Sequence, residues 1–306
     1  MRLTLNIRGV RDLYGEEKCA KYVKEAGFDA VDYCLCNMAD PSHIFNGDSF
    51  EEEAKRIRAI YEAEGLQIVQ THTPFWFDKW DNEEHFNGFI MDTMKRSVAV
   101  SALLGADVAV VHPVHWMRYE GRAEEIFEIN MKYYGELIPV AKQYGIKIAV
   151  ENMFQMDERR WIHIHDTCST IDEFLRYVDS LDSEYIIACL DVGHAGLPSG
   201  GKAESWDFVR ALGHDRLKSL HVHDNDYRGD AHQLPFMGKI NWNEVTRALG
   251  EIDYDGDFTY EISSKWISDR LKHVGEDFAA GELGYMASVG RHLMKKIDAA
   301  RPGKGN

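Results

Sequence analysis

Short segments rich in apolar residues alternate with amphipathic segments along most of the 306-residue chain. A run of four to eight mostly apolar residues is typical of a buried strand, whereas apolar positions three and four residues apart are typical of a helix with one buried face. The short runs predict eight strands, at residues 3–7, 30–35, 66–70, 107–111, 146–150, 186–190, 217–220 and 258–260. The amphipathic segments predict helices at 15–26, 50–64, 82–104, 124–144, 171–181, 206–212 and 242–250.

Glycine stands between several predicted helices and the strands that follow them. Gly27, Gly65, Gly105 and Gly145 all have this position, and glycine ends helices readily because it tolerates the left-handed backbone of a helix cap. Regular alternation of strand and helix implies a parallel sheet, and eight units within about 250 residues favour a closed barrel over an open sheet. We therefore expect an α/β fold, a single (β/α)₈ TIM barrel over residues 1–298, followed by a frayed polar tail over 299–306.

The chain is strongly acidic, with 51 Asp and Glu residues against 35 Lys and Arg residues and a formal net charge of −16. Such a charge repels a phosphate backbone and an anionic membrane surface, so we expect neither a nucleic-acid nor a membrane partner. No segment approaches the roughly 20 consecutive apolar residues of a spanning helix, and the N-terminal segment lacks the apolar core of a signal peptide. The oligomeric state stays open, with a homo-oligomer as one alternative.

The five cysteines, Cys19, Cys34, Cys36, Cys168 and Cys189, are odd in number and include no C-x-x-C motif. They predict no disulfide framework, which suits a reducing cytoplasm. Cys34 and Cys36 lie two residues apart at the end of the predicted strand 30–35, where a shared face is expected. We expect both to be buried thiols rather than metal ligands.

The carboxyl ends of the predicted strands are polar, and these ends form the active-site face of a TIM barrel. A single His or Asp at a strand end has an ordinary explanation, because strand ends are where polar groups first meet water. Six consecutive strands ending in such a residue instead predict a site at one mouth of the barrel. From strand three to strand eight, these residues are His72, His112, Glu151, Asp191, His221 and Glu261.

Carboxylates that converge on one barrel mouth repel each other and raise each other's pKa unless a positive charge compensates. A divalent cation is the economical solution. We expect Glu151, Asp191, His221 and Glu261 to hold that cation. A donor set rich in oxygen suits Mn²⁺, Mg²⁺ or Co²⁺ at least as well as Zn²⁺.

The motifs at these strand ends resemble those of the xylose isomerase-like TIM barrel superfamily, over nearly the whole chain. The superfamily contains sugar and sugar phosphate isomerases and epimerases, inosose dehydratases and apurinic endonucleases, and the motifs do not single out one of them. They are His72, His112-Pro113, Glu151-Asn152, Asp191-Val192-Gly193-His194, His221-Val222-His223-Asp224 and Glu261.

The resemblance to ketose 3-epimerases implies that the four metal ligands include two catalytic groups, with Glu151 and Glu261 also moving protons. It further implies that His194 contacts a substrate hydroxyl. We expect substrate contacts from His72, His112, His194, Trp116, Asp230 and His232.

The same residues leave the number of metals open. Asp230 and His232 resemble the D-x-H segment that completes a three-metal site in the endonucleases together with His194. His72 and His112 resemble ligands of the remaining endonuclease zinc. The chain therefore has the residues for one, two or three metals, and His223 is not expected to be a first ligand.

The loops after the strands carry aromatic rather than basic residues, and Trp116 is one example. Aromatic faces suit the apolar side of a sugar ring, with a packed hydrophobic lid as the alternative. No glycine-rich phosphate loop follows strand seven or eight, which favours an unphosphorylated substrate. The acidic charge argues against an endonuclease.

These observations predict a metal-dependent isomerase or epimerase of a small sugar, a ketose or related polyol, that works by proton transfer through two glutamates. A dehydratase or lyase acting on an inosose or keto-glycoside would need the same base and metal. A hydrolase of the apurinic endonuclease type and a non-enzymatic sugar-binding barrel complete the alternatives.

Overall fold

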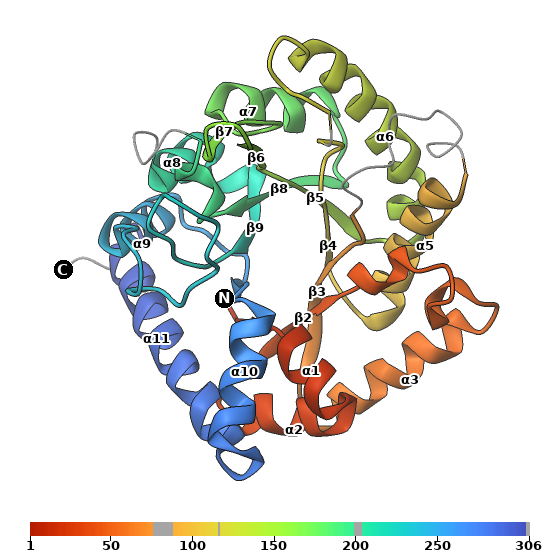
Figure 1. The fold of residues 1–306 in the computed structure, drawn as a ribbon, viewed down its shortest axis with the longest axis vertical. Coiled ribbons are helices and arrows are strands. Elements are labelled where there is room, and N and C mark those ends of the chain that lie inside the picture. The colour runs from red at the N-terminus through yellow and green to blue at the C-terminus, as the bar shows by residue number, and fades with distance from the viewer. Residues whose placement is uncertain (76–87, 116, 199–203, 304–306) are drawn as a thin grey trace.

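The computed structural model describes residues 1–75, 88–115, 117–198 and 204–303. Eight parallel strands form one sheet in the order β10-β1-β2-β3-β4-β5-β8-β9. The predicted strands and the TIM barrel are confirmed, and Figure 1 looks along the barrel. The strands are β1 (Leu3–Asn6), β2 (Ala30–Cys34), β3 (Gln67–His72), β4 (Val108–Val111), β5 (Lys147–Glu151), β8 (Ile186–Asp191), β9 (Leu217–His221) and β10 (Phe258–Tyr260).

The two edges of the sheet meet just beyond β9. The Val222 N–H donates to the Thr259 carbonyl at 2.8 Å, and the Glu261 N–H donates to the Val222 carbonyl at 3.2 Å. These bonds join the end of β9 to the end of β10. They bring the last two predicted ligand-bearing strand ends, at His221 and Glu261, side by side.

Helices surround the strands on the outside of the barrel (Figure 1). The sequence pattern predicts seven of their positions but not α1, α10 and α11; α1 buries only Gly9 and Val10, which leaves little apolar pattern to detect. The helices are α1 (Arg8–Tyr14), α2 (Glu16–Glu25), α3 (Phe50–Ala63), α5 (Phe89–Leu104), α6 (Ala123–Tyr144), α7 (Ile171–Ser180), α8 (Ser205–Arg216), α9 (Trp242–Glu251), α10 (Ser264–Val274) and α11 (Ala279–Ala300).

Strand alternation divides the core and aims the polar strand ends inward. Side chains along a strand point to opposite faces in turn. Val150 packs in the large core between strands and helices, whereas Ala149 and Cys189 belong to a small cluster with Val110 and Ile187. Glu151 and Asp191 each follow a residue of the small cluster by two positions, so they point to the same side, at its carboxyl end.

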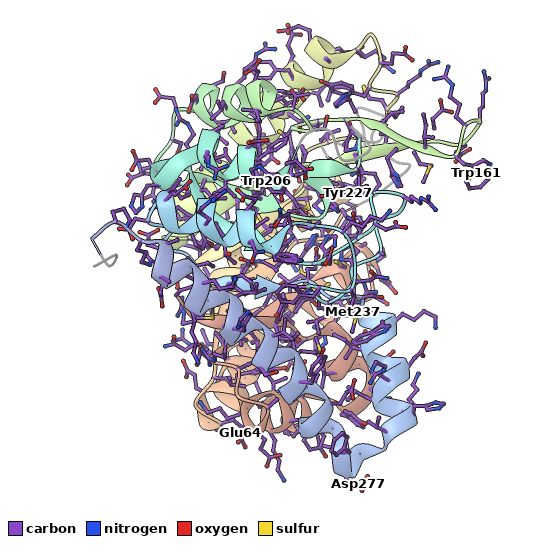
Figure 2. All side chains as sticks on the ribbon, turned by 90° about the vertical axis from the view of Figure 1, so that its left-hand side faces the viewer. Glu64, Trp161, Trp206, Tyr227, Met237 and Asp277 are labelled. Carbon is purple, nitrogen blue, oxygen red and sulfur yellow. The ribbon has the colours of Figure 1, made fainter. Side chains whose placement is uncertain are left out.

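A short hairpin that the sequence pattern did not predict rises beside the barrel mouth. It consists of β6 (Phe154–Asp157) and β7 (Ile162–His165), which pair antiparallel. Trp161 at its turn is 78% exposed and projects away from the body of the protein (Figure 2).

Helix α11 continues to Ala300, two residues past the domain boundary expected at residue 298. Beyond it, the Arg301 guanidinium donates to the Tyr254 carbonyl at 2.6 Å and contacts Asp253. These contacts attach the end of the helix to the segment before β10. Residues 304–306 lie outside the described parts of the chain.

Asp224 anchors the long loop between β9 and α9, the loop that carries Asp230 and His232. Its buried carboxylate accepts hydrogen bonds from the Phe236 N–H at 2.9 Å, the Trp242 indole N–H at 2.8 Å and the Ile240 N–H at 3.2 Å. One side chain thus fixes both ends of the loop.

Replacing Asp224 should destabilise the protein. Asp224→Ala leaves two buried donors, the Ile240 N–H and the Trp242 indole N–H, and the part-buried Phe236 N–H unpaired. Each unpaired buried donor costs about 1–3 kcal/mol. We expect a loss of at least about 2 kcal/mol in the free energy of unfolding by urea, and no comparable loss for the exposed control Asp215→Ala. Equal stabilities of the two variants would contradict the anchoring role.

Candidate metal and substrate site

Four strand ends bring three carboxylates around one imidazole. Nδ1 of His221 lies 3.1 Å from a Glu151 oxygen, 3.3 Å from a Glu261 oxygen and 4.0 Å from an Asp191 oxygen. The side chains of Glu151, Asp191 and His221 are buried, and that of Glu261 is 17% exposed. The structure therefore gathers all four residues that the sequence pattern singles out as metal ligands.

This arrangement fits a divalent cation. One atom from each of the four residues lies within 4.8 Å of the others, and ligands held about 2.0–2.2 Å from a common cation are necessarily within about 4.4 Å of one another. Oε2 of Glu151 and Nε2 of His221 are buried atoms without a hydrogen bond of good geometry among the described residues. Unpaired buried donors and acceptors are costly, so the site calls for a further binding partner.

Asp191 is held in place by its neighbours on both sides. Its backbone N–H donates to the Asn152 side chain at 2.8 Å, and the Asn152 amide donates back to the Asp191 carbonyl at 3.0 Å. The His194 N–H donates to the Asp191 carboxylate at 2.7 Å. The E-N and D-V-G-H motifs thus tie the ends of β5 and β8 together.

His72 and His112 form one wall of the site. His72 Nε2 lies 3.0 Å from His112 Nε2, which in turn lies 3.2 Å from a Glu151 oxygen. His72 Nδ1 lies 2.9 Å from the Thr73 carbonyl; a carbonyl only accepts, so Nδ1 carries the proton and Nε2 faces the site as an acceptor. Burial lowers the pKa of His72 to about 3, with the nearby His112 acting in the same direction.

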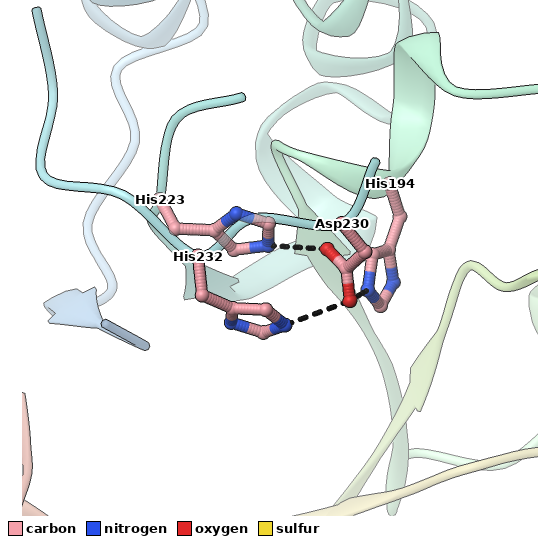
Figure 3. A group of neighbouring side chains, drawn as sticks. All are labelled: His194, His223, Asp230 and His232. Atoms are coloured by element: carbon pink, nitrogen blue, oxygen red, sulfur yellow. Dashed lines mark hydrogen bonds and ion pairs between the residues drawn. The ribbon is translucent and has the colours of Figure 1, made fainter. Parts of the chain in front are cut away.

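A second group of ligand-type residues adjoins the first and consists of His194, His223, Asp230 and His232 (Figure 3). The nearest distances to the Asp230 carboxylate are 2.8 Å from His232, 3.6 Å from His194 and 3.7 Å from His223, each measured from Nε2. His223 Nε2 also lies 3.0 Å from an Asp191 oxygen. Asp191 therefore links the second group to the first.

Two imidazoles of the second group are oriented by backbone carbonyls. His232 Nδ1 donates to the Glu261 carbonyl at 2.7 Å, and His194 Nδ1 donates to the Asn152 carbonyl at 3.0 Å. Both rings consequently present Nε2 toward Asp230. His223 belongs to this group although the sequence pattern did not predict it as a ligand. It lies two residues beyond the strand end at His221, in the H-x-H motif.

The buried acids and imidazoles of the two groups shift one another's pKa values. Burial acts to lower the pKa of His221, but Glu261 and Glu151 raise it well above its ordinary value. Burial likewise opposes a raised pKa at His232, yet Asp230 raises it to about 10. Burial, reinforced by Glu151 and Asp191, raises the pKa of Glu261 to about 8 despite the opposing effect of His221. A cation entering the site must displace some of these protons.

Both groups open into one cavity of about 810 Å³, a size within the usual range of small-molecule sites. Its lining includes predicted substrate contacts from His72, His112, His194, Asp230 and His232. Phe75 stacks on His112, with ring centroids 4.7 Å apart, and Phe154 of the hairpin packs against His194. Trp116, the remaining predicted substrate contact, lies outside the described residues.

The fold and the motif residues agree with a comparison to known families. The xylose isomerase-like TIM barrel family matches residues 20–282, and the chain belongs to this family.

Individual relatives connect this family to sugars and to a metal. An uncharacterized protein of Methanocaldococcus jannaschii is 31% identical over 71% of this chain and 69% of its own length. Fructoselysine 3-epimerase of Shigella flexneri is 20% identical over 83% of this chain and 87% of its own length. The solved structure of the IolI protein with a zinc atom bound aligns with a TM-score of 0.71, at 17% identity, over 96% of this chain and 99% of that one.

No helix in the described parts of the chain combines the length and the apolarity that a membrane span requires.

Metal content should fall sharply in Asp191→Asn and in His221→Ala, because each change removes one ligand of four. Elemental analysis of the purified variants measures this directly. The exposed control Asp172→Asn should keep the metal content of the unmodified protein. Full metal occupancy in both site variants would contradict the assignment of these four residues as ligands.

Cation affinity should weaken as the pH falls. Glu261, whose pKa is raised to about 8, carries a proton below that pH, and a cation can bind its carboxylate only after that proton leaves. Calorimetric titration with Mn²⁺ should show proton release and an affinity at least about tenfold lower near pH 6 than near pH 8. Glu261→Gln, which has no such proton, should show a smaller pH dependence. Binding without proton release would contradict this linkage.

Proposed function

We propose that this protein is a divalent-metal-dependent isomerase or epimerase of a ketose or related polyol, in which Glu151 and Glu261 transfer the proton. The observation that supports this most directly is the convergence of the two carboxylates, from β5 and from the end of β10, on the single imidazole of His221. Both carboxylates line the cavity. The fructoselysine 3-epimerase relative supports a sugar as the substrate class.

The two glutamates have different environments, which suits an acid and a base. Burial acts to raise the pKa of Glu151, but His221 and His112 lower it well below its ordinary value. Burial raises the pKa of Glu261 instead. Pairs of carboxyl groups whose surroundings separate their pKa values are typical of acid and base roles. One of the two glutamates would accept the carbon-bound proton, and the other would deliver a proton from the opposite side of the substrate.

The remaining residues would bind and orient the substrate. A cation held by Glu151, Asp191, His221 and Glu261 would polarise the substrate carbonyl and the neighbouring hydroxyl. His72 Nε2, an acceptor because its Nδ1 proton is committed to Thr73, would exchange the hydrogen bond from His112 Nε2 for one from a substrate hydroxyl. Phe75 and Phe154 would cover the apolar face of the sugar, which excludes water from the proton-transfer step.

The second group supports a second candidate function. His194, His223, Asp230 and His232 would hold another cation, since Nδ1 of His223 and Oδ1 of Asp230 are buried without a hydrogen bond among the described residues. Adjacent cations favour hydrolysis of phosphate esters. The net charge of −16 argues against DNA as the phosphate ester.

A dehydratase or lyase would need only the cation held by Glu151, Asp191, His221 and Glu261. A product that lacks one molecule of water relative to the substrate would distinguish a dehydratase from an isomerase.

Turnover in D₂O should place deuterium on the reacting carbon. A proton that passes through Glu151 or Glu261 exchanges with solvent before it returns, whereas a hydride shift keeps the original hydrogen. Mass spectrometry of products from a panel of ketohexoses and keto-glycosides measures the label. Product that forms without deuterium would contradict the two-glutamate mechanism.

Glu151→Gln and Glu261→Gln should each lower kcat by more than about 10²-fold, because each removes a proton-transfer group and weakens a metal ligand. Steady-state kinetics with saturating Mn²⁺ would measure the change. Glu184→Gln, an exposed carboxylate outside the cavity, serves as the matched control. Near-normal turnover in either site variant would remove that glutamate from the mechanism.

Abasic duplex DNA should not be incised, and binding to it should be undetectable at physiological salt, because the acidic surface repels phosphate. A fluorescence anisotropy titration and a nicking assay test this. Salt-dependent binding in the micromolar range would instead favour the hydrolase.

A further inference from the structure

A pair of thiols lies in the wall of the cavity, at the carboxyl end of β2. Cys34 ends the strand, and Cys36 begins the short 3₁₀ helix η1 (Cys36–Ala39). Both residues line the cavity, and Cys36 is not fully buried, contrary to the expectation from sequence. Cys19, Cys168 and Cys189 are completely buried.

The backbone brings the two sulfur atoms together. Leu35, with φ −99° and ψ 10°, turns the chain between the strand and the helix. In consequence the Cys34 and Cys36 sulfurs lie 2.9 Å apart. A disulfide bond is about 2.05 Å long, so bond formation would require the two sulfurs to approach by less than about 1 Å.

Hydrogen bonding and nearby positive charge favour Cys34 as the attacking sulfur, although this residue, in the wall of the cavity, is only 5% exposed. The Cys36 N–H donates a hydrogen bond to the Cys34 sulfur at 3.4 Å, and the Cys34 and Cys36 thiols hydrogen-bond to each other. The hydrogen bond with the Cys36 thiol lowers the pKa of Cys34, and the positive charges of Arg11 and Arg8 also lower it. Burial acts in the opposite direction. The thiolate is the nucleophile in thiol–disulfide exchange.

We propose that Cys34 and Cys36 form a reversible dithiol–disulfide site that a low-molecular-weight disulfide oxidises from the cavity. The Cys34 thiolate attacks one sulfur of that disulfide, forms a mixed disulfide and releases the first small thiolate. Cys36 then loses its proton and attacks the Cys34 sulfur, which releases the second small thiolate. The protein dithiol is oxidised by two electrons, and the small disulfide is reduced to two thiols.

Oxidation would act on the wall of the proposed metal site. Cys36 Sγ lies 3.8 Å from His72 Nδ1 and 4.0 Å from the Thr73 carbonyl. The His72 ring stacks on that of His221, with centroids 5.5 Å apart. A bond to Cys34 would draw the Cys36 sulfur away from these groups. The dithiol chemistry itself does not rest on the proposed function.

Mass spectrometry after treatment of the folded, full-length protein with oxidised glutathione tests this proposal. The protein should lose the mass of two hydrogen atoms, carry no glutathione and return to its original mass with dithiothreitol. Both cysteines fall within one tryptic peptide, 25–55, which should contain the internal bond. Cys19→Ala, which removes a buried thiol elsewhere, should behave like the unmodified protein.

Single variants test the order of attack. Cys36→Ser should accumulate one glutathione on Cys34, because no second thiol resolves the mixed disulfide, whereas Cys34→Ser should react at least about tenfold more slowly. Two free thiols after prolonged treatment of the unmodified protein, or stable glutathione adducts without the internal bond, would overturn the proposal. Adduct formation at equal rates in the two variants would overturn the assignment of Cys34 as the attacking sulfur.

Discussion

Burying several carboxylates at the mouth of one barrel is the constraint on which the rest of this site depends. Glu151 and Asp191 are fully buried, and Glu261 is largely so. Ionised groups lose the solvation of water on burial, and like charges in a poorly polarisable interior repel strongly. The carboxylates raise the pKa of His221 and burial raises that of Glu261, so both side chains favour their protonated forms. A divalent cation would replace those protons with a stronger compensating charge.

The barrel supplies the framework that this balance needs. Parallel strands all end on one face, and alternation points Glu151 and Asp191 to the side where Ala149 and Cys189 pack. Hydrogen bonds outside the ligand set then fix positions, as Asn152 does for Asp191. Gly193 is required for a steric reason: a Cβ there would lie 2.0 Å from the His223 ring. The D-V-G-H motif thus combines a ligand, a close approach and an oriented imidazole.

Sequence patterns predict those features that repeat along the chain. Strands with both faces buried, such as β8, produce continuous apolar runs, and Gly105 and Gly145 adopt the left-handed cap conformation expected of them. The group of Glu151, Asp191, His221 and Glu261 could be predicted from the strand ends alone, because the carboxyl ends of all the strands of a barrel lie at the same mouth.

Features that depend on loop conformation could not be predicted in this way. The position of His223 beside Asp191 and Asp230 is set by how the chain leaves β9, and the β6–β7 hairpin forms between two barrel elements. Cys36 was expected to continue the strand face that carries Cys34, but the turn at Leu35 starts a 3₁₀ helix and brings the Cys36 sulfur beside that of Cys34. In each case a local backbone turn, rather than hydrophobic period, decides which side chains meet.

The central claim is that one cation sits among Glu151, Asp191, His221 and Glu261, and anomalous diffraction from crystals soaked in Mn²⁺ tests it most directly. We predict an anomalous peak within about 2.0–2.4 Å of an atom from each of the four side chains. A difference map without a peak there, in crystals that bind Mn²⁺ only elsewhere, would contradict the account.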